Sequence, residues 1–324
     1  MNRAIGVLFV AFVVAATAYA FSGRSDSPMP PTQVRISNLQ MLDAAESPEG
    51  RLLAVGERGK IFISDDRGGS WRAASAPGAA VLAAVRFIDA RQAVAVGHDA
   101  VVLRSEDGGE SWRMVQSDPE AEEPLFGLWL GEGGQGFAVG AYGRFLATSD
   151  GGETWAPREI EANADALHLN AVLPLGGERF LIAGEAGTLL RSDDGGQTWS
   201  ALESPYAGSF FNALSLAEGR ALVFGMRGHV FRTDDAGDSW TEVDTGVHAS
   251  LFGGRVLRDG RVVLVGQSGV VLVSADQGHS FDRLQGPDRL VRAAVAEVGD
   301  GEILLVGEEG VVRMTLPAVV GEKS

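Results

Sequence analysis

Six aspartates recur at one position of a repeated octet, and their carboxylates are the first groups in this chain that could perform chemistry. The octet reads Ser or Thr, any residue, Asp, any residue, Gly, any residue, Ser or Thr, then Trp or Phe. Its aspartates are Asp66, Asp107, Asp150, Asp194, Asp235 and Asp276. Grouped carboxylates can act in acid–base catalysis or bind calcium. One aspartate per unit of 41 to 44 residues keeps the six apart, however, so they cannot converge on one substrate.

A structural role explains the whole octet better. The Asp side chain can accept hydrogen bonds from backbone N–H groups of a tight turn, and the glycine two residues later permits a backbone conformation that other residues avoid. The closing aromatic can bury a large ring between neighbouring units. These aromatics are Trp71, Trp112, Trp155, Trp199, Trp240 and Phe281. A local calcium site at each turn is the less favoured alternative.

Other catalytic and ligand-binding patterns are missing from the sequence. The chain has no cysteine, and its five histidines lie in different units or loops without a pair spaced for a metal ion. Its Gly-Gly pairs precede strands and not helices, so they do not form a phosphate-binding loop. The formal net charge of −16 argues against nucleic acid as a partner. The sequence therefore predicts no catalytic residue, metal or cofactor.

The elements that position the octets are short strands. An apolar strand ending in glycine precedes each octet, and a seventh such strand near residue 307 has no octet after it. In the second unit the pattern predicts strands at 81–88, 92–96, 101–105 and 111–115. Four short strands per unit of about 41 residues are typical of a propeller blade. We therefore predict an all-β, seven-bladed β-propeller, in which residues 33–37 supply the missing outer strand of the last blade and close the ring.

The ends of the chain have a different composition. Residues 1–20 begin with a positive charge, continue as an apolar run and end in Ala-Tyr-Ala, a pattern typical of a cleaved signal peptide. The alternative is a retained membrane anchor over residues 4–21. Residues 21–32 are predicted to be a flexible tether, 33–317 the propeller and 318–324 a tail. Either reading of the first segment predicts export, to the periplasm or an equivalent lumen.

The repeats resemble those of known families. The octets resemble Asp-boxes, the repeats of bacterial neuraminidases, and the unit with its glycine-ended hairpin more closely resembles the photosystem II stability and assembly factor family. The resemblance covers roughly residues 34–316. It implies a non-enzymatic, exported scaffold that engages a membrane or envelope protein during assembly.

Two alternatives to that function remain open. The chain could be an accessory protein of an envelope exporter, or a sialidase-like propeller that binds or hydrolyses glycans. A sialidase resembles a six-bladed propeller with an arginine triad and a tyrosine nucleophile. Here the early Arg-Ile-Pro motif is missing, and only Tyr142 and Tyr206 lie beyond the signal segment.

Partner-binding residues are predicted from what varies between units. The turns joining the second and third strands differ most, and they should share one face with the segments that open each blade, opposite the octets. Their cationic and aromatic residues are the candidates for binding a partner: Arg58, Lys60, Tyr142, Arg144, Arg227 and His229. The family resemblance also implies an arginine-rich patch, although the acidic turns of the second and seventh units interrupt it. The acidic run at 119–124 is predicted to be a solvated loop, with an acidic contact as the alternative.

Overall fold

The computed structural model describes residues 2–21, 35–299 and 301–318, in two units, Met1–Val34 and Arg35–Ser324. In the first unit, helix α1 spans Asn2–Phe21 and includes most of the predicted signal or anchor segment. No helix of the described residues is both long and apolar enough to cross a membrane. The predicted tether beyond Phe21 and the predicted tail beyond Ala318 lie outside the described residues.

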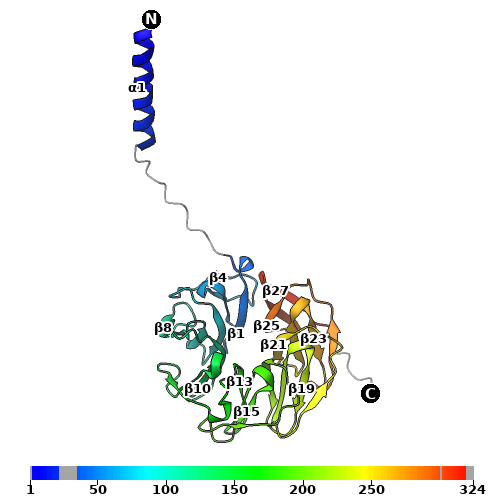
Figure 1. Cartoon of the computed structure of the whole chain (residues 1–324). Helices are drawn as coiled ribbons and strands as arrows, with labels where there is room; N and C mark the ends of the chain where they lie inside the picture. Colours follow the sequence, from blue (N-terminus) through cyan, green and yellow to red (C-terminus); the bar gives the residue numbers. More distant parts are fainter. Residues whose placement is uncertain (1, 22–34, 300, 319–324) are drawn as a thin grey trace. The chain divides into compact units, whose positions relative to one another are not determined.

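The second unit is a ring of seven antiparallel sheets around a central space (Figure 1). Within each sheet the strands pair in chain order. Blade 1 contains β1 Met41–Glu46, β2 Leu52–Gly56, β3 Ile61–Ser64 and β4 Arg72–Ala73. Blade 2 contains β5 Leu82–Phe87, β6 Ala93–Gly97, β7 Val102–Ser105 and β8 Arg113–Gln116. Blade 3 contains β9 Leu125–Leu130, β10 Gly136–Gly140, β11 Phe145–Thr148 and β12 Ala156–Pro157.

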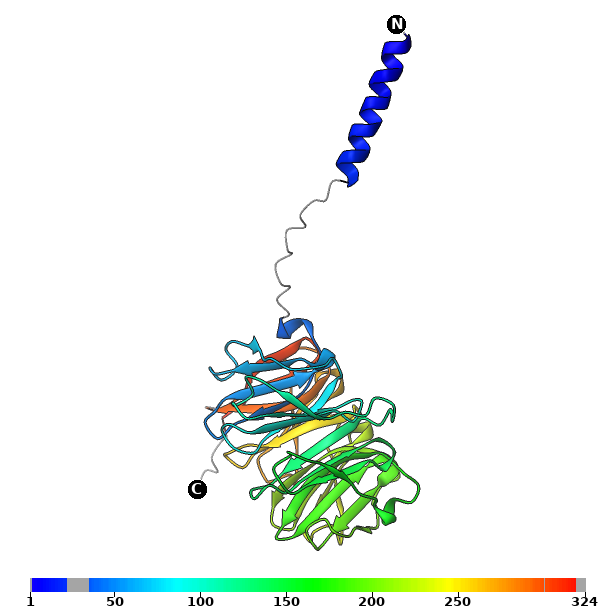
Figure 2. The ribbon, with the colours of Figure 1, turned by 90° about the vertical axis from the view of Figure 1, so that its left-hand side faces the viewer.

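The remaining blades repeat this order, and Figure 2 shows the ring from its side. Blade 4 contains β13 Leu169–Gly176, β14 Arg179–Gly184, β15 Leu189–Ser192 and β16 Ser200–Ala201. Blade 5 contains β17 Phe210–Ala217, β18 Arg220–Gly225, β19 Val230–Thr233 and β20 Thr241–Val243. Blade 6 contains β21 Leu251–Val256, β22 Val262–Gly266, β23 Val271–Ser274 and β24 Asp282–Leu284. Blade 7 contains β25 Arg292–Gly299, β26 Glu302–Gly307 and β27 Gly310–Thr315.

The prediction of an all-β, seven-bladed propeller is confirmed, and the four strands of blade 2 lie within two residues of their predicted bounds. The second strand of each blade has other blades against both faces, which is why its sequence is an apolar run without alternation. In β2 and β6 every residue is buried. The hydrophobic core therefore lies mainly between adjacent sheets, and each of its clusters joins residues of two blades.

Ring closure differs in detail from the prediction. The sheet of blade 7 has three strands in the described residues. Gln33 and Val34 of the predicted closing strand lie outside those residues, and Ile36–Asn38 forms a 3-10 helix, η1, instead of a strand. Ile36 packs near Val311 of β27 in a cluster that also joins Met41 of blade 1 to Val306 of blade 7. Among the described residues, side-chain packing between the first and last blades thus closes the ring.

Short 3-10 helices occur in several of the connections between strands. Five of them join the second and third strands of their blades: η2 Glu57–Gly59, η3 Ala141–Gly143, η5 Glu185–Gly187, η6 Met226–Gly228 and η7 Gln267–Gly269. A further one, η4 Glu161–Asn163, precedes blade 4. The turns joining second to third strands and the octets joining third to fourth strands lie at opposite ends of the third strand. The propeller therefore has a turn face and an Asp-box face.

Candidate functional site

On the Asp-box face, each aspartate is held by hydrogen bonds from its own octet. Asp150 Oδ1 accepts from the Thr154 backbone N–H at 3.0 Å and from the Thr148 hydroxyl at 2.7 Å. Its Oδ2 accepts from the Thr154 hydroxyl at 2.6 Å. The bonds from Thr154 are the main reason why the pKa of Asp150 falls from 3.8 to about 2. The carboxylate is ionised but already engaged, which suits a turn and not a catalyst.

The other five octets repeat this arrangement. Their aspartates accept from the Ser or Thr four residues later, and the pKa of each is lowered. Within the described residues, no group of three or more His, Asp or Glu side chains could hold a metal ion. The geometry therefore places the six predicted aspartates in six separate turns.

The closing aromatics pack between blades. Trp112 is only 7% exposed, lies in a cluster with residues of blades 1 and 2, and donates from Nε1 to the Gly109 carbonyl at 2.9 Å. The other five are partly buried, and each packs against its own blade and a neighbouring one: Trp71, Trp155, Trp199, Trp240 and Phe281. These rings join neighbouring sheets, as the sequence predicted.

The turn face repeats a different hydrogen bond. In each of the seven blades, the first residue of the turn donates its N–H to the carbonyl just before the innermost strand. In blade 2 this bond runs from His98 to the Val81 carbonyl at 2.8 Å. The preceding Gly97 is required because a Cβ there would lie 2.0 Å from the same oxygen. The prediction that these turns share a face with the segments opening the blades is thus confirmed.

The second residue of every turn adopts a left-handed conformation, whatever its type. It is Arg58, Asp99, Tyr142, Ala186, Arg227, Ser268 or Glu309. Non-glycine residues rarely take this conformation, so its repetition shows that the turn geometry is fixed by the blade. Three predicted partner-binding residues occupy this position, Arg58, Tyr142 and Arg227, and all three are exposed. The side chain of Arg58 is 74% exposed and Tyr142 is 62% exposed.

The other three candidates come directly after the turns and are less accessible to a partner: Lys60, Arg144 and His229. Arg144, only 20% exposed, pairs with Glu123 and lies 3.9 Å from Asp118. His229 Nδ1 lies 2.6 Å from Glu242, and its ring packs on Tyr206 with centroids 4.5 Å apart. Lys60 is half-buried. Glu123 belongs to the acidic run at 119–124, which lies between β8 and β9 with Pro119, Glu120 and Glu122 exposed, as the prediction of a solvated loop requires.

An aromatic pair supports one of the exposed candidates. The Tyr142 ring lies edge-on to His168 with centroids 4.8 Å apart, and the Tyr142 backbone N–H donates to His168 Nδ1 at 2.8 Å. The Phe126 ring also lies edge-on to His168, with centroids 6.3 Å apart. Tyr142 is therefore exposed yet held in position. The six predicted residues divide into an outward group, Arg58, Tyr142 and Arg227, and a partly engaged group, Lys60, Arg144 and His229.

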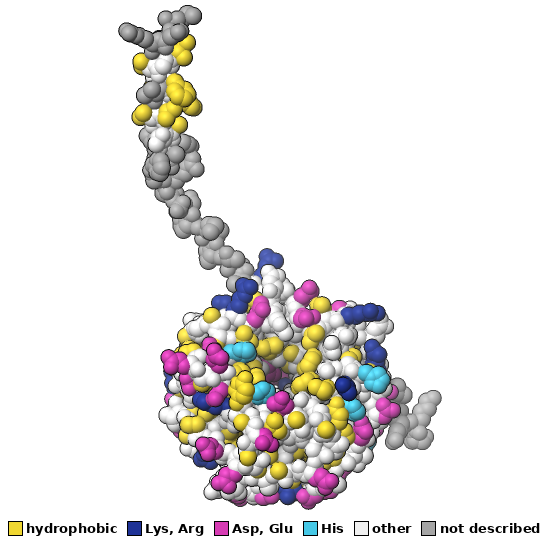
Figure 3. Space-filling view, in the orientation of Figure 1, with side chains coloured by type: hydrophobic (Ala, Val, Ile, Leu, Met, Phe, Trp, Pro, Cys, Tyr) yellow, Lys and Arg dark blue, Asp and Glu magenta, His cyan; other side chains and the backbone are white. Residues whose placement is uncertain are grey.

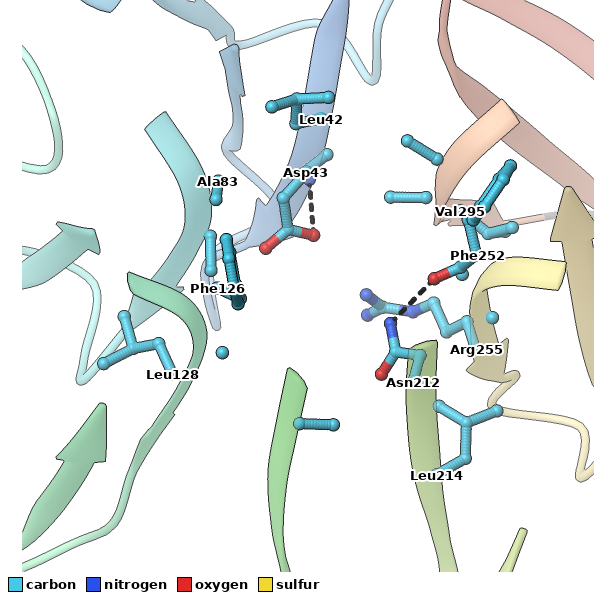
Figure 4. Close-up of a pocket in the computed structure, with 18 of the residues that line it drawn as sticks. Leu42, Asp43, Ala83, Phe126, Leu128, Asn212, Leu214, Phe252, Arg255 and Val295 are labelled. Carbon is cyan, nitrogen blue, oxygen red and sulfur yellow. Dashed lines mark hydrogen bonds between the residues drawn. The ribbon is translucent and has the colours of Figure 1, made fainter. Parts of the chain in front are cut away.

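A central cavity of about 780 Å³ carries charged lining residues that sequence reasoning missed. It is lined by the innermost strands of all seven blades, and Figure 3 shows hydrophobic side chains around a central hollow. Phe126, Phe211 and Phe252 line it, together with two acids and two arginines, Asp43, Glu46, Arg86 and Arg255. Figure 4 shows Phe126, Phe252, Asp43 and Arg255 around the cavity. The available signal was a single arginine at the fifth position of both β5 and β21, in strands otherwise free of charge.

Polar side chains in this cavity also tie blades together. Asn170 donates to the Phe210 carbonyl at 2.7 Å, and Asn212 to the Phe252 carbonyl at 3.1 Å. Asp43 of blade 1 accepts from the Val85 N–H of blade 2 at 3.0 Å. These bonds orient neighbouring inner strands and fix the shape of the cavity wall.

Together these features define an Asp-box propeller with a structural face, a variable turn face and a lined central cavity. The family model described as photosynthesis system II assembly factor YCF48 matches residues 120–252. The chain is thus a seven-bladed propeller that is similar to the photosystem II assembly factor family over this part of its length. A comparison with curated proteins gives no sequence match.

Solved structures share the fold at low identity. "YCF48 bound to D1 peptide" has a TM-score of 0.70 and 16% identity, covering 88% of this chain and 96% of that one. "YCF48 from Cyanidioschyzon merolae" has a TM-score of 0.68 and 17% identity, covering 89% and 97%. A streptogramin B lyase structure has a TM-score of 0.75 and 12% identity, covering 88% and 96%. Because an enzyme is among them, this likeness speaks for the fold and not for an activity.

Proposed function

We propose that the chain is a non-enzymatic scaffold that binds a membrane or envelope protein through its turn face and assists its assembly. The observation that carries this proposal is the contrast between a repeated turn backbone and the different side chains it displays. Arg58, Tyr142 and Arg227 stand exposed on that face. Arginine and tyrosine are favoured at protein interfaces because they combine apolar area with directed hydrogen bonds.

Two further points support a binding role over catalysis. The octet aspartates, the most numerous regularly placed carboxylates, already accept hydrogen bonds within their own turns. One structural relative is described as bound to a peptide of D1. Export to the periplasm or an equivalent lumen, by a cleaved signal or with residues 4–21 as an anchor, is part of the proposal and rests on the N-terminal sequence alone.

The test is recovery of partners from solubilised native membranes by the tagged full chain. The variant is Arg58→Glu with Arg227→Glu, which reverses two exposed charges on the turn face. The matched control is Arg158→Glu with Arg283→Glu, the same charge change at exposed positions beside or within outer strands β12 and β24. We expect the first variant to lose a membrane-protein partner that wild type and control both recover.

Other outcomes would redirect the proposal. Equal recovery by both variants would remove the turn face from partner binding. Recovery of exporter subunits would favour the exporter-accessory alternative, and selective retention on glycans without a protein partner would favour the glycan alternative. Protease protection of the tagged chain in intact cells, lost when the outer envelope is opened, is the expected result for export.

A further inference from the structure

Two arginines face the central cavity from the same level of the ring. Strands β5 and β21 each begin with a buried leucine, contain a bulge after it, and carry arginine as their fifth residue, Arg86 and Arg255. Both arginines line the cavity. The fifth residues of the other innermost strands are uncharged: Ala45, Trp129, Leu173, Leu214 and Ala296. Two of the seven innermost strands therefore carry a positive charge at their fifth residue.

The acids of the cavity already accept hydrogen bonds, whereas Arg255 donates none within the described residues. Asp43 accepts from Arg86 at 2.5 Å and from the backbone N–H groups of Ala44 and Val85 at 2.9 and 3.0 Å. Glu46 accepts from Arg258 at 2.5 Å. Arg255 lies 3.6 Å from the second oxygen of Glu46, beyond hydrogen-bond distance, and makes no hydrogen bond within the described residues. Arg255 thus offers unused guanidinium N–H donors to this site.

Burial acts against the positive charge of Arg255. Its side chain is 31% exposed and reaches into the cavity (Figure 4). Burial lowers the pKa of Arg255; Glu46 and Glu297 oppose this shift, while the positive charges of Arg86 and Arg258 add to it. A carboxylate beside Arg255 would supply the missing acceptor in the planar geometry that guanidinium prefers.

The walls nearer the turn face are apolar. Phe126, Phe211 and Phe252 are the second residues of their strands, and the Phe211 and Phe252 rings lie 5.5 Å apart. Arg255 follows Phe252 by three residues, which corresponds to about 10 Å along an extended strand. A ligand of this length could place an apolar end among the rings and a charged end at the arginine.

We propose that the central cavity binds a monocarboxylic acid with an apolar body, its carboxylate at Arg255 and Arg86 and its body against the phenylalanines. The volume of about 780 Å³ is in the range of small-molecule sites. A peptide fits less well, because its backbone needs several partners and the amides of Asn170 and Asn212 are already bonded to the blades. This site is separate from the turn-face residues of the proposed function, so either can fail alone.

The experiment is isothermal titration of the purified protein with octanoate and, as the uncharged match, octan-1-ol. The variants are Arg255→Gln and Arg86→Gln, and Arg227→Gln on the turn face is the control. Arg255→Gln should keep the fold, because Glu46 retains Arg258 as its partner. A thermal unfolding curve of each variant checks that point.

We expect wild type and Arg227→Gln to bind octanoate equally and at least tenfold more tightly than octan-1-ol. Arg255→Gln should weaken octanoate binding by at least tenfold without changing octanol binding, and Arg86→Gln should weaken it less, because Asp43 already shares that guanidinium. The proposal is overturned if octanoate does not bind up to its solubility limit, if octan-1-ol binds as well, or if folded Arg255→Gln binds octanoate like wild type. Binding of an apolar peptide acid at this site in place of octanoate would also overturn it.

Discussion

The Asp-box face and the turn face of this propeller solve the same problem in opposite ways. Both must supply hydrogen-bond partners for backbone groups at the ends of strands, in seven turns on the turn face and in six octets on the Asp-box face. On the Asp-box face the acceptor is a side chain, such as Asp150, so the residue type is fixed. On the turn face the acceptor is a backbone carbonyl, such as that of Val81, so the residue type is free.

This difference explains where a propeller can vary. A side chain that satisfies the backbone cannot also recognise a partner, whereas a turn held by backbone bonds leaves its side chains unused. Arg58, Tyr142 and Arg227 share one backbone conformation and still present different chemistry. We therefore expect substitutions on the Asp-box face to change stability, and substitutions on the turn face to change binding.

The largest effect is expected from Trp112→Ala. This ring is buried between blades 1 and 2 and its Nε1 is hydrogen-bonded, so its loss should lower the free energy of unfolding by about 3–5 kcal/mol. Tyr142→Ala on the turn face is the control and should cost under about 0.5 kcal/mol. Urea unfolding followed by circular dichroism measures both, and similar losses would abolish the distinction between the faces.

Asp150→Ala should have the next largest effect. It removes an acceptor for the Thr154 N–H and for two hydroxyl groups, and we expect a loss of about 1–3 kcal/mol. Asp165→Ala, at an exposed aspartate outside any octet, serves as the control. If the two variants were equally stable, the octet carboxylate would have no structural role.

Acid should weaken the Asp-box face selectively. The pKa values of Asp66, Asp150, Asp194 and Asp276 are about 2, against an ordinary value of 3.8. A carboxylate whose pKa is lowered by folding stabilises the fold at any pH above its pKa in the unfolded chain. That contribution is lost as the pH falls from about 4 through 2. When the free energy of unfolding is measured across this pH range, it should fall less steeply for Asp150→Asn than for wild type. Parallel curves would mean that this carboxylate does not contribute to acid sensitivity.

The smallest stability effect is expected from the turn-face pair Arg58→Glu and Arg227→Glu. Arg58 lies 4.0 Å from Glu57 and is mostly exposed, and Arg227 has no ion pair within the described residues. The free energy of unfolding should therefore change by under about 0.5 kcal/mol. Arg144→Glu should cost more, because it places a like charge beside Glu123 and Asp118. A large loss of free energy of unfolding in the double variant would show that these side chains stabilise the fold.

The sequence by itself determined the blade count, the strands and the turns of this protein. These depend on local chemistry: apolar runs that form strands, glycines where the chain must approach itself, and octets whose Asp, Ser or Thr groups bond within eight residues. Each signal is repeated along the chain, so one ambiguous unit is corrected by the others. The separation of the variable turns from the octets follows from strand order alone.

Only the tertiary structure decided which charges remain available. Arg144 and Arg227 look alike in sequence, yet Glu123 engages the first and no described residue pairs with the second. Asp43 and Arg86 meet across two blades, and Arg255 is left without a hydrogen bond, 3.6 Å from one oxygen of Glu46 while Arg258 bonds the other. The expected closing strand likewise gave way to a 3-10 helix at Ile36–Asn38. Such outcomes depend on which side chains meet across the ring, and residue type and spacing along the chain do not specify that.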